Sequence, residues 1–378
     1  MTVPVIAAYV RSPFQPARKG ELVDVRPDEL CAQVVRALVE RSGVDGGEIE
    51  DLTVGCAFPE GEQGMNMGRI AGVLAGRPRS VAGATVNRFC GSSMQAVHTA
   101  AGAIALDMGE AYIAAGVESM TRISGREDAY EPHPGLAASY PQLYLSMGET
   151  AERVAARFDV SRERQEAFAA ESQRKAADAR SEGRLNAEIT PVQSGEREVA
   201  ADGCLRPGTT AAVLATLAPA FRPDGSVTAG TSSPLTDGAA ACLVTSAGYA
   251  ERRGLRPLAA IRAFALSGCE PEIMGIGPIE ATRKVLARAG LTIDDVDVME
   301  LNEAFASQAL AVIDALGIDP ERVNLDGGAI ALGHPLGATG ARITGKAAQL
   351  LQRTGGRYAV AAQCIGGGQG IATLLERV

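Results

Sequence analysis

The chain of 378 residues has no tryptophan, three histidines and few aromatic residues, which make up 4% of the total. It also lacks an excess of basic residues, because its formal net charge is −9. An acidic chain does not attract a phosphate backbone along its surface, so nucleic-acid binding is excluded and an anionic ligand needs local basic residues. Seven cysteines without a CxxC pair favour a reducing compartment over a disulfide framework, and we expect no metal site.

Long apolar runs are missing too, and no stretch approaches the length of a membrane-spanning helix. Residues 1–11 lack the basic region of a secretory signal peptide and are typical of a first strand. The last residues, Glu376-Arg377-Val378, do not form a Ser-Lys-Leu peroxisomal signal. We therefore expect a cytoplasmic protein without membrane insertion.

The chain is rich in glycine, with 44 residues, and its hydrophobic content of 46% is enough for a large core. Apolar runs of strand length alternate with helical periodicity along residues 3–115, and again from residue 259. This alternation predicts an α/β fold with βαβ crossovers and mostly parallel sheets covered by helices. Ligands of such sheets bind at the carboxyl ends of the strands.

Two segments of the chain, residues 37–58 and 284–305, align with each other without a gap. Each contains a helix end, a glycine at the same offset (Gly43 and Gly290), an acidic turn and a short apolar strand. This duplication predicts two halves that pack together, with a site between the ends of their strands.

The duplication also suggests the limits of the domains. We expect the first half to comprise residues 1–118 with 236–258, and the second to comprise residues 259–378. Residues 119–235 show little βα alternation and contain Pro- and Gly-rich stretches. They are expected to form an inserted subdomain, either a lid or ligand-binding region or an inert surface elaboration.

Three residues beside glycines carry the predicted chemistry. Cys90 precedes a helix expected from Ser92, where unpaired N–H groups and the helix dipole favour a thiolate. His334 can take a proton from a thiol at neutral pH. Cys364 ends an apolar strand and enters a glycine run, whose N–H groups could form an oxyanion hole. Together they indicate acyl transfer through a cysteine thioester, whereas the alternative for each thiol is packing in the core.

Further polar residues have more than one interpretation. Asn302 follows an apolar strand and could orient a water or polarise a carbonyl. Glu303 could act in the site, or its carboxylate could interact with the dipole at the N-terminus of the next helix. His98 lies on an apolar helix face and is expected to be structural. The remaining cysteines are expected to pack in the core: Cys31, Cys56, Cys204, Cys242 and Cys269.

The motifs around these residues resemble those of the thiolases, and most closely the bacterial degradative group that acts on 3-ketoacyl-CoA. They are NRFCGSS at 87–93, TAGTSS at 228–233, NEAF at 302–305, GGAIALGHPLG at 327–337 and CIGGGQG at 364–370. The resemblance implies the thiolase fold, in which two duplicated halves with mixed sheets form αβαβα layers and carry an inserted loop subdomain.

The resemblance also implies a role for each residue. Cys90 would accept the acyl group, His334 would activate it, and Cys364 would move the proton of the acetyl-CoA α-carbon. Asn302 would hold a water that forms one oxyanion hole with His334, and the N–H groups of Cys90 and Gly366 would form the other. The contacts to coenzyme A would map to Arg206, Ser233, Ala229, Ala304, Phe305, His133 and Met147, with Arg206 supplying the local positive charge.

The implied reaction is the thiolytic cleavage of 3-ketoacyl-CoA in fatty acid β-oxidation, with coenzyme A or acetyl-CoA as co-substrate and no permanent cofactor. The resemblance further implies a homodimer or tetramer, joined through residues 111–116 and the turn at 87–90, and leaves open a β-oxidation hydratase–dehydrogenase partner.

Three other functions stay open. One is biosynthetic condensation of two acetyl-CoA molecules, and another is a non-catalytic acyl-CoA-binding scaffold. The third is a decarboxylating ketoacyl synthase, against which Cys364 argues. Thr231 replaces an asparagine of many thiolases, and the segment from His133 to Met147 is short, so the length of the acyl pocket does not follow from the resemblance.

The apolar residues of this segment could line an acyl tunnel or pack the subdomain: Leu136, Tyr140, Leu143, Tyr144 and Leu145. The resemblance of the loop at 231–233 and of residues 133–136 to the degradative group favours medium or long acyl chains.

Overall fold

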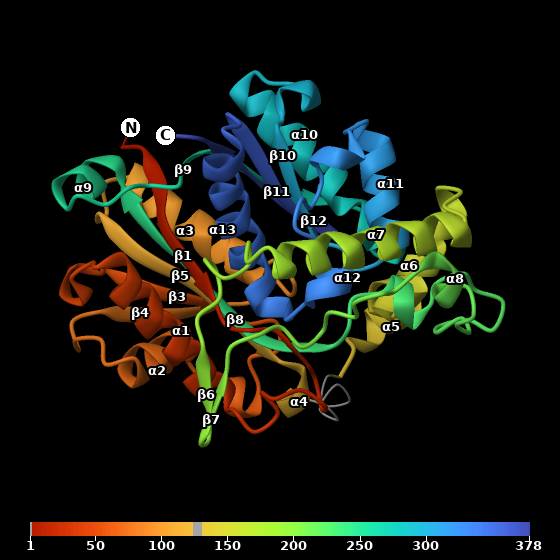
Figure 1. Ribbon diagram of the computed structural model, residues 1–378, viewed down its shortest axis with the longest axis horizontal. Helices are drawn as coiled ribbons and strands as arrows, with labels where there is room; N and C mark the ends of the chain where they lie inside the picture. Colours follow the sequence, from red (N-terminus) through yellow and green to blue (C-terminus); the bar gives the residue numbers. More distant parts are fainter. Residues whose placement is uncertain (1, 124–130) are drawn as a thin grey trace.

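The computed structural model describes residues 2–123 and 131–378 (Figure 1). Most strands form one large sheet in the order β10-β11-β12-β9-β1-β8-β5-β3-β4, with β2 paired to β8, while β6 and β7 form a small separate sheet. The strands are β1 (Pro4–Arg11), β2 (Gln15–Pro16), β3 (Asp51–Gly55), β4 (Ala82–Val86), β5 (Ala111–Ser119), β6 (Val192–Ser194), β7 (Arg197–Val199), β8 (Thr236–Ser246), β9 (Ala259–Gly268), β10 (Val298–Leu301), β11 (Tyr358–Ile365) and β12 (Gln369–Glu376).

The α-helices are α1 (Pro27–Ser42), α2 (Met67–Leu74), α3 (Ser92–Ala105), α4 (Met120–Ile123), α5 (Pro134–Ser139), α6 (Met147–Arg157), α7 (Arg162–Ser181), α8 (Ala211–Leu214), α9 (Ala247–Arg252), α10 (Gly277–Ala289), α11 (Ala306–Leu316), α12 (Ala329–Leu332) and α13 (Leu336–Thr354). Short 3₁₀ helices are η1 (Gly46–Glu48), η2 (Gly61–Gln63), η4 (Pro141–Tyr144), η5 (Ala229–Thr231), η6 (Pro271–Ile276), η7 (Ile293–Asp295) and η8 (Pro320–Arg322). The expected insertion at 119–235 includes residues 124–130, which lie outside the described residues.

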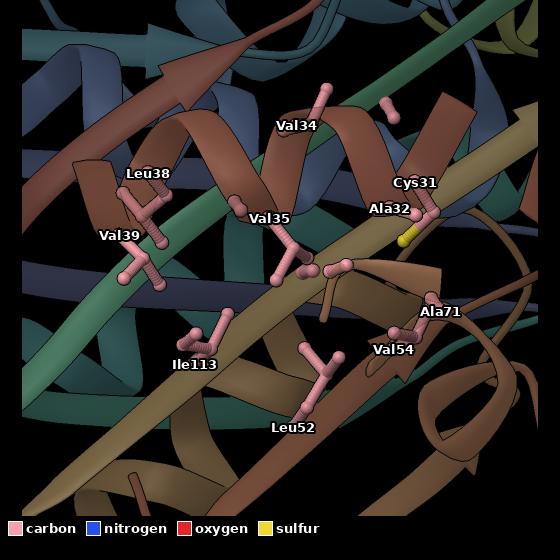
Figure 2. Close-up of a cluster of buried hydrophobic side chains, with 14 of the residues drawn as sticks. Cys31, Ala32, Val34, Val35, Leu38, Val39, Leu52, Val54, Ala71 and Ile113 are labelled. Atoms are coloured by element: carbon pink, nitrogen blue, oxygen red, sulfur yellow. The ribbon is translucent and has the colours of Figure 1, made fainter. Parts of the chain in front are cut away.

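The helices and the sheet form five layers. In the first half, α1 buries its apolar face mainly against β8, β5 and β1, and its Val35 and Leu38 belong to the same buried cluster as Leu52 and Ile113 (Figure 2). Helices α3 and α13 pack together in the centre (Figure 1), where they share a second buried cluster with strands of both halves. Helices α10 and α11 cover the outer face of the second half. This arrangement confirms the αβαβα layering.

The strand directions differ from the expectation. In the described part of the large sheet, three neighbouring pairs are parallel, β3–β4, β3–β5 and β10–β11, and six are antiparallel. The prediction of mostly parallel sheets is therefore wrong. Strands buried on both faces are uniformly apolar whichever way they run, so composition alone did not reveal the antiparallel β8 and β12.

The two aligned segments have the same local structure. Helices α1 and α10 both end at a left-handed glycine, Gly43 with φ of 70° and Gly290 with φ of 68°. Each glycine is followed by a 3₁₀ helix and a strand, and the order β3-β5-β8-β1 in one half matches β10-β11-β12-β9 in the other. The halves meet where β1 pairs with β9 through Val5 with Ala260 and Ile6 with Ala259.

The two edges of the large sheet lie at β10 and at the partly exposed β4, whereas β5 is buried between β3 and β8. Residues 111–116 therefore offer no free strand edge to a second subunit, and the subunit contact expected there stays a prediction. In residues 2–123 and 131–378, no helix is long and apolar enough to cross a membrane.

Candidate active site

Cys90 occupies a tight turn between β4 and α3. Phe89 has a left-handed φ of 44°, which is uncommon for a bulky residue and marks a strained turn. The carbonyl oxygen of Phe89 accepts hydrogen bonds from the Ser92 hydroxyl at 2.6 Å and the Ser92 N–H at 3.1 Å. These bonds fix the peptide plane that carries the Cys90 N–H.

His334 lies in the loop between α12 and α13 and is 5% exposed. Its Nδ1 lies 2.6 Å from the Thr339 hydroxyl, which itself donates to the carbonyl oxygen of Pro335 at 3.1 Å. Because the hydroxyl proton is used there, Thr339 accepts from Nδ1–H, and Nε2 keeps its lone pair. The amide Nδ2 of Asn302 lies 3.3 Å from that Nε2, so the structure brings Asn302 and His334 together as expected.

Cys364 lies at the end of β11 and is 1% exposed. It shares a buried cluster with three of the expected coenzyme A contacts, Met147, Ala304 and Phe305. The glycine turn after β11 then brings the N–H of Gly366 to the Cys90 sulfur, where it and the N–H of Cys90 itself favour the charged form. Two backbone donors therefore converge at the nucleophile, as an oxyanion hole requires.

The electrostatics of Cys90 differ from the expectation. Burial raises the pKa of the Cys90 thiol to about 11, although the Gly366 N–H lowers it. Burial also lowers the pKa of His334 to about 3, assisted by the positive charge of Arg342. The prediction that the helix terminus favours a thiolate is therefore wrong for the resting site, because desolvation outweighs the N–H groups. Thiol and imidazole both rest neutral, and the thiol needs a base.

A cavity of about 370 Å³ opens onto Cys90. Its lining is mainly apolar: Phe58, Phe89, Cys90, Leu143, Tyr144, Met147, Leu336, Gly366 and Gly367. Leu143 and Tyr144 belong to the segment expected to surround an acyl chain, whereas Leu136 and Tyr140 of that segment are exposed, at 40% and 39%.

The other candidates for coenzyme A contacts lie in two places. Ser233 binds the carbonyl oxygen of Ala304 through its N–H at 3.0 Å and its hydroxyl at 3.1 Å, and Ala229 begins the 3₁₀ helix just before it. Arg206 and His133 are exposed on the surface. The His133 ring caps α5 by accepting from the Leu136 N–H at 3.3 Å, and no hydrogen bond joins it to Cys90 or Cys364 in the described chain.

Two buried carboxylates hold the helices and loops that surround the site. Glu118 on β5 accepts from the N–H groups of Ala57 at 2.8 Å and Gly337 at 2.9 Å, which fixes the start of α13. Glu303 accepts from the Ser172 hydroxyl at 2.6 Å and the Ile330 N–H at 3.2 Å. Glu303 therefore anchors α7 to α12 and faces away from the reacting groups.

Glu118, Thr339 and Gln363 were not predicted from the sequence as residues of the site. Glu118 and Gln363 had a visible signal, since Glu118 is the one charged residue of β5 and Gln363 is the one amide residue of β11, each near the end of an otherwise mainly apolar strand. Thr339 had none, because a threonine in the first turn of a helix is ordinary. His98 is structural as predicted: it is buried, its Nε2 lies 2.7 Å from the Thr373 hydroxyl, and it stacks on Phe264.

Comparison with known proteins identifies the fold family. The family described as "Thiolase, N-terminal domain" matches residues 4–248, and "Thiolase, C-terminal domain" matches residues 255–377. The 3-ketoacyl-CoA thiolase of Bacillus subtilis (strain 168) is 46% identical over 385 residues, which cover 98% of each chain. That of Acinetobacter baumannii (strain AYE) is 47% identical over 382 residues, covering 99% of this chain and 98% of the relative. That of Marinomonas sp. (strain MWYL1) is 46% identical over 384 residues, with the same coverage. The chain belongs to the thiolase family.

Proposed function

We propose that the protein is a 3-ketoacyl-CoA thiolase, which uses coenzyme A to cleave a 3-ketoacyl-CoA into acetyl-CoA and a shortened acyl-CoA. The observation that supports the proposal is the approach of Cys364 and of the N–H groups of Cys90 and Gly366 to the Cys90 sulfur, which lines an apolar cavity. The names of the relatives support the same reaction.

In the first half-reaction, the sulfur of Cys90 attacks the keto carbon while its proton passes to Nε2 of His334. This nitrogen has the free lone pair, because Nδ1–H is engaged by Thr339. The N–H groups of Cys90 and Gly366 stabilise the oxyanion that forms when the thiol adds to the keto carbon. Asn302 with His334 stabilises the enolate oxygen of the departing acetyl-CoA. The carbon–carbon bond then breaks, an acyl-enzyme remains on Cys90, and the acetyl-CoA enolate takes a proton from Cys364.

In the second half-reaction, the thiol of free coenzyme A loses its proton to the Cys364 thiolate and attacks the thioester carbon. The bond to Cys90 breaks, and the Cys90 sulfur recovers its proton from His334. The site returns to its neutral resting form. Because one product leaves before coenzyme A attacks, ping-pong kinetics follow.

Coenzyme A would bind as co-substrate beside the insertion at 119–235. Arg206 supplies an exposed positive charge for its phosphates, and the remaining contacts are Ala229, Ser233, Ala304, Phe305, Met147 and His133. We further propose a homodimer or tetramer in the cytoplasm, so light scattering at micromolar concentration should exceed the 39.0 kDa of one chain.

The acyl chain would fill the apolar cavity, and we propose a preference for medium or long chains. Each buried methylene contributes about 0.8 kcal/mol, so kcat/KM should rise by up to about 15-fold with every added carbon pair until the cavity is full. Thiolysis of 3-ketoacyl-CoAs of 4, 8, 12 and 16 carbons tests the proposal, with Cys90→Ala as the inactive control. Activity confined to the substrate of four carbons would favour a biosynthetic acetyl-CoA acetyltransferase. Activity of Cys90→Ala would contradict the assignment of Cys90 as the nucleophile.

A further inference from the structure

Gln363 lies on β11 directly before Cys364 and carries a side-chain amide. The residues around it on the strand are apolar, and it is fully buried. Its Nε2 donates a hydrogen bond to the backbone carbonyl oxygen of Cys90, a residue 273 positions away in the chain. The strand that carries Cys364 is thus bonded directly to the backbone of the nucleophile.

The Cys90 turn also fits closely against β11. A Cβ atom on Gly91 would lie 2.6 Å from the Cδ1 atom of Ile365, so the turn approaches the strand as near as a glycine allows. The Cys90 carbonyl oxygen precedes the helical ladder of α3, whose first bond joins the Gln95 N–H to the Gly91 oxygen at 2.9 Å. The carbonyl therefore needs a partner from outside the helix, and Gln363 provides one.

A second amide fixes the other side of the oxyanion hole. Arg88 donates to Oε1 of Gln369 at 3.1 Å, and Nε2 of Gln369 lies 3.5 Å from the carbonyl oxygen of Gly366. The two N–H donors at the nucleophile come from different halves of the protein, since Cys90 lies in the first half and Gly366 in the second. Their separation depends on how firmly the Cys90 turn is docked on β11.

We propose that Gln363 is a positioning residue, which holds the Cys90 turn so that the N–H groups of Cys90 and Gly366 converge on one substrate oxygen. The inference rests on the proposed function for its reaction. A displacement of about 1 Å in such a site costs roughly 100-fold in rate, and loss of one oxyanion donor costs about 100- to 1,000-fold.

Gln363→Met keeps the length of the side chain and removes its hydrogen bond. We expect acylation of Cys90 by p-nitrophenyl acetate to slow at least about tenfold, because it needs the oxyanion hole. Alkylation by iodoacetamide forms no oxyanion, so its rate should stay within about twofold, as should KM for coenzyme A. Gln352→Met is the matched control, since it removes an amide bond to the carbonyl oxygen of Leu258 at the surface.

Gln363→Glu supplies a second, pH-dependent test. A neutral carboxylic acid can donate to the Cys90 carbonyl oxygen, whereas a carboxylate repels it. Acylation relative to wild type should therefore fall as the pH rises through the pKa of the new carboxyl. A flat ratio would overturn the proposal, and so would wild-type acylation in Gln363→Met.

A parallel loss of acylation, alkylation and melting temperature in both variants would also overturn the proposal, since it indicates a purely structural residue. The test is separate from the proposed function, because p-nitrophenyl acetate requires no coenzyme A. Failure of the wild type to cleave any 3-ketoacyl-CoA would contradict the function and leave the acylation result valid.

Discussion

Thr339→Val tests whether the hydroxyl of Thr339 sets the protonation of His334. Valine has nearly the shape of threonine but accepts no hydrogen bond, so Nδ1–H of the buried imidazole would lose its partner. An unpaired buried donor costs about 1–3 kcal/mol, which corresponds to a shift of roughly 5- to 150-fold toward the tautomer with its proton on Nε2.

The structure already contains an acceptor for that other tautomer. The Oδ1 atom of Asn302 is buried without a hydrogen-bond partner in the described chain, and rotation of the amide would bring it to Nε2 of His334. With Nε2 protonated, His334 cannot take the proton of Cys90. We therefore expect kcat to fall by about 5- to 150-fold, while KM for coenzyme A changes little.

The assay combines steady-state thiolysis with ¹⁵N NMR, which is feasible because the chain has three histidines. The His334 nitrogen shifts should exchange their assignment in Thr339→Val, whereas Thr339→Ser keeps the hydroxyl and should resemble wild type. Unchanged shifts together with a kcat within twofold of wild type would refute the reasoning.

Three further perturbations follow from the site. Cys364→Ala should form the acyl-enzyme but lose exchange of the acetyl-CoA α-protons, measured by deuterium uptake; normal exchange would remove Cys364 from its proposed role. Because burial raises the pKa of Cys90 to about 11, its thiolate fraction grows as pH rises, so iodoacetamide should react about tenfold faster per pH unit from pH 6 to 9; a plateau below pH 8 would indicate a preformed thiolate. In Gly337→Ala the new Cβ would lie 2.5 Å from the Val117 oxygen and 2.7 Å from the Gly55 oxygen, so urea unfolding should show a loss of at least about 1–3 kcal/mol, and an unchanged midpoint would contradict this packing.

The sequence was sufficient to nominate the proposed reacting groups, because a strand end followed by glycine is a local pattern. Cys90, His334 and Cys364 each have that context, and the structure brings the Gly366 N–H to the Cys90 sulfur and the Asn302 amide to within 3.3 Å of His334. The duplication that contains Gly43 and Gly290 could also be predicted from local sequence, since each glycine ends a helix in the left-handed conformation.

Properties that depend on distant segments could not be predicted. The pKa of Cys90 follows from burial, and the cavity beside Cys90 is lined by Met147 and Leu336, which are remote in sequence. The bond from Gln363 to Cys90 joins residues 273 positions apart. Strand direction was also hidden, because β8 and β12, which pair only antiparallel with their neighbours, are as buried as β5 and β11, which also take part in parallel pairs.

The pairing of β1 has a consequence for synthesis of the chain on the ribosome. Its partners are β8 and β9, so residues 12–235 must be made before the first of them begins to appear. At about 5–20 residues per second this takes roughly 10–45 s, during which β1 has neither edge paired. A buried apolar strand left open for that time invites aggregation, so we expect the nascent chain to associate with chaperones until β8 emerges.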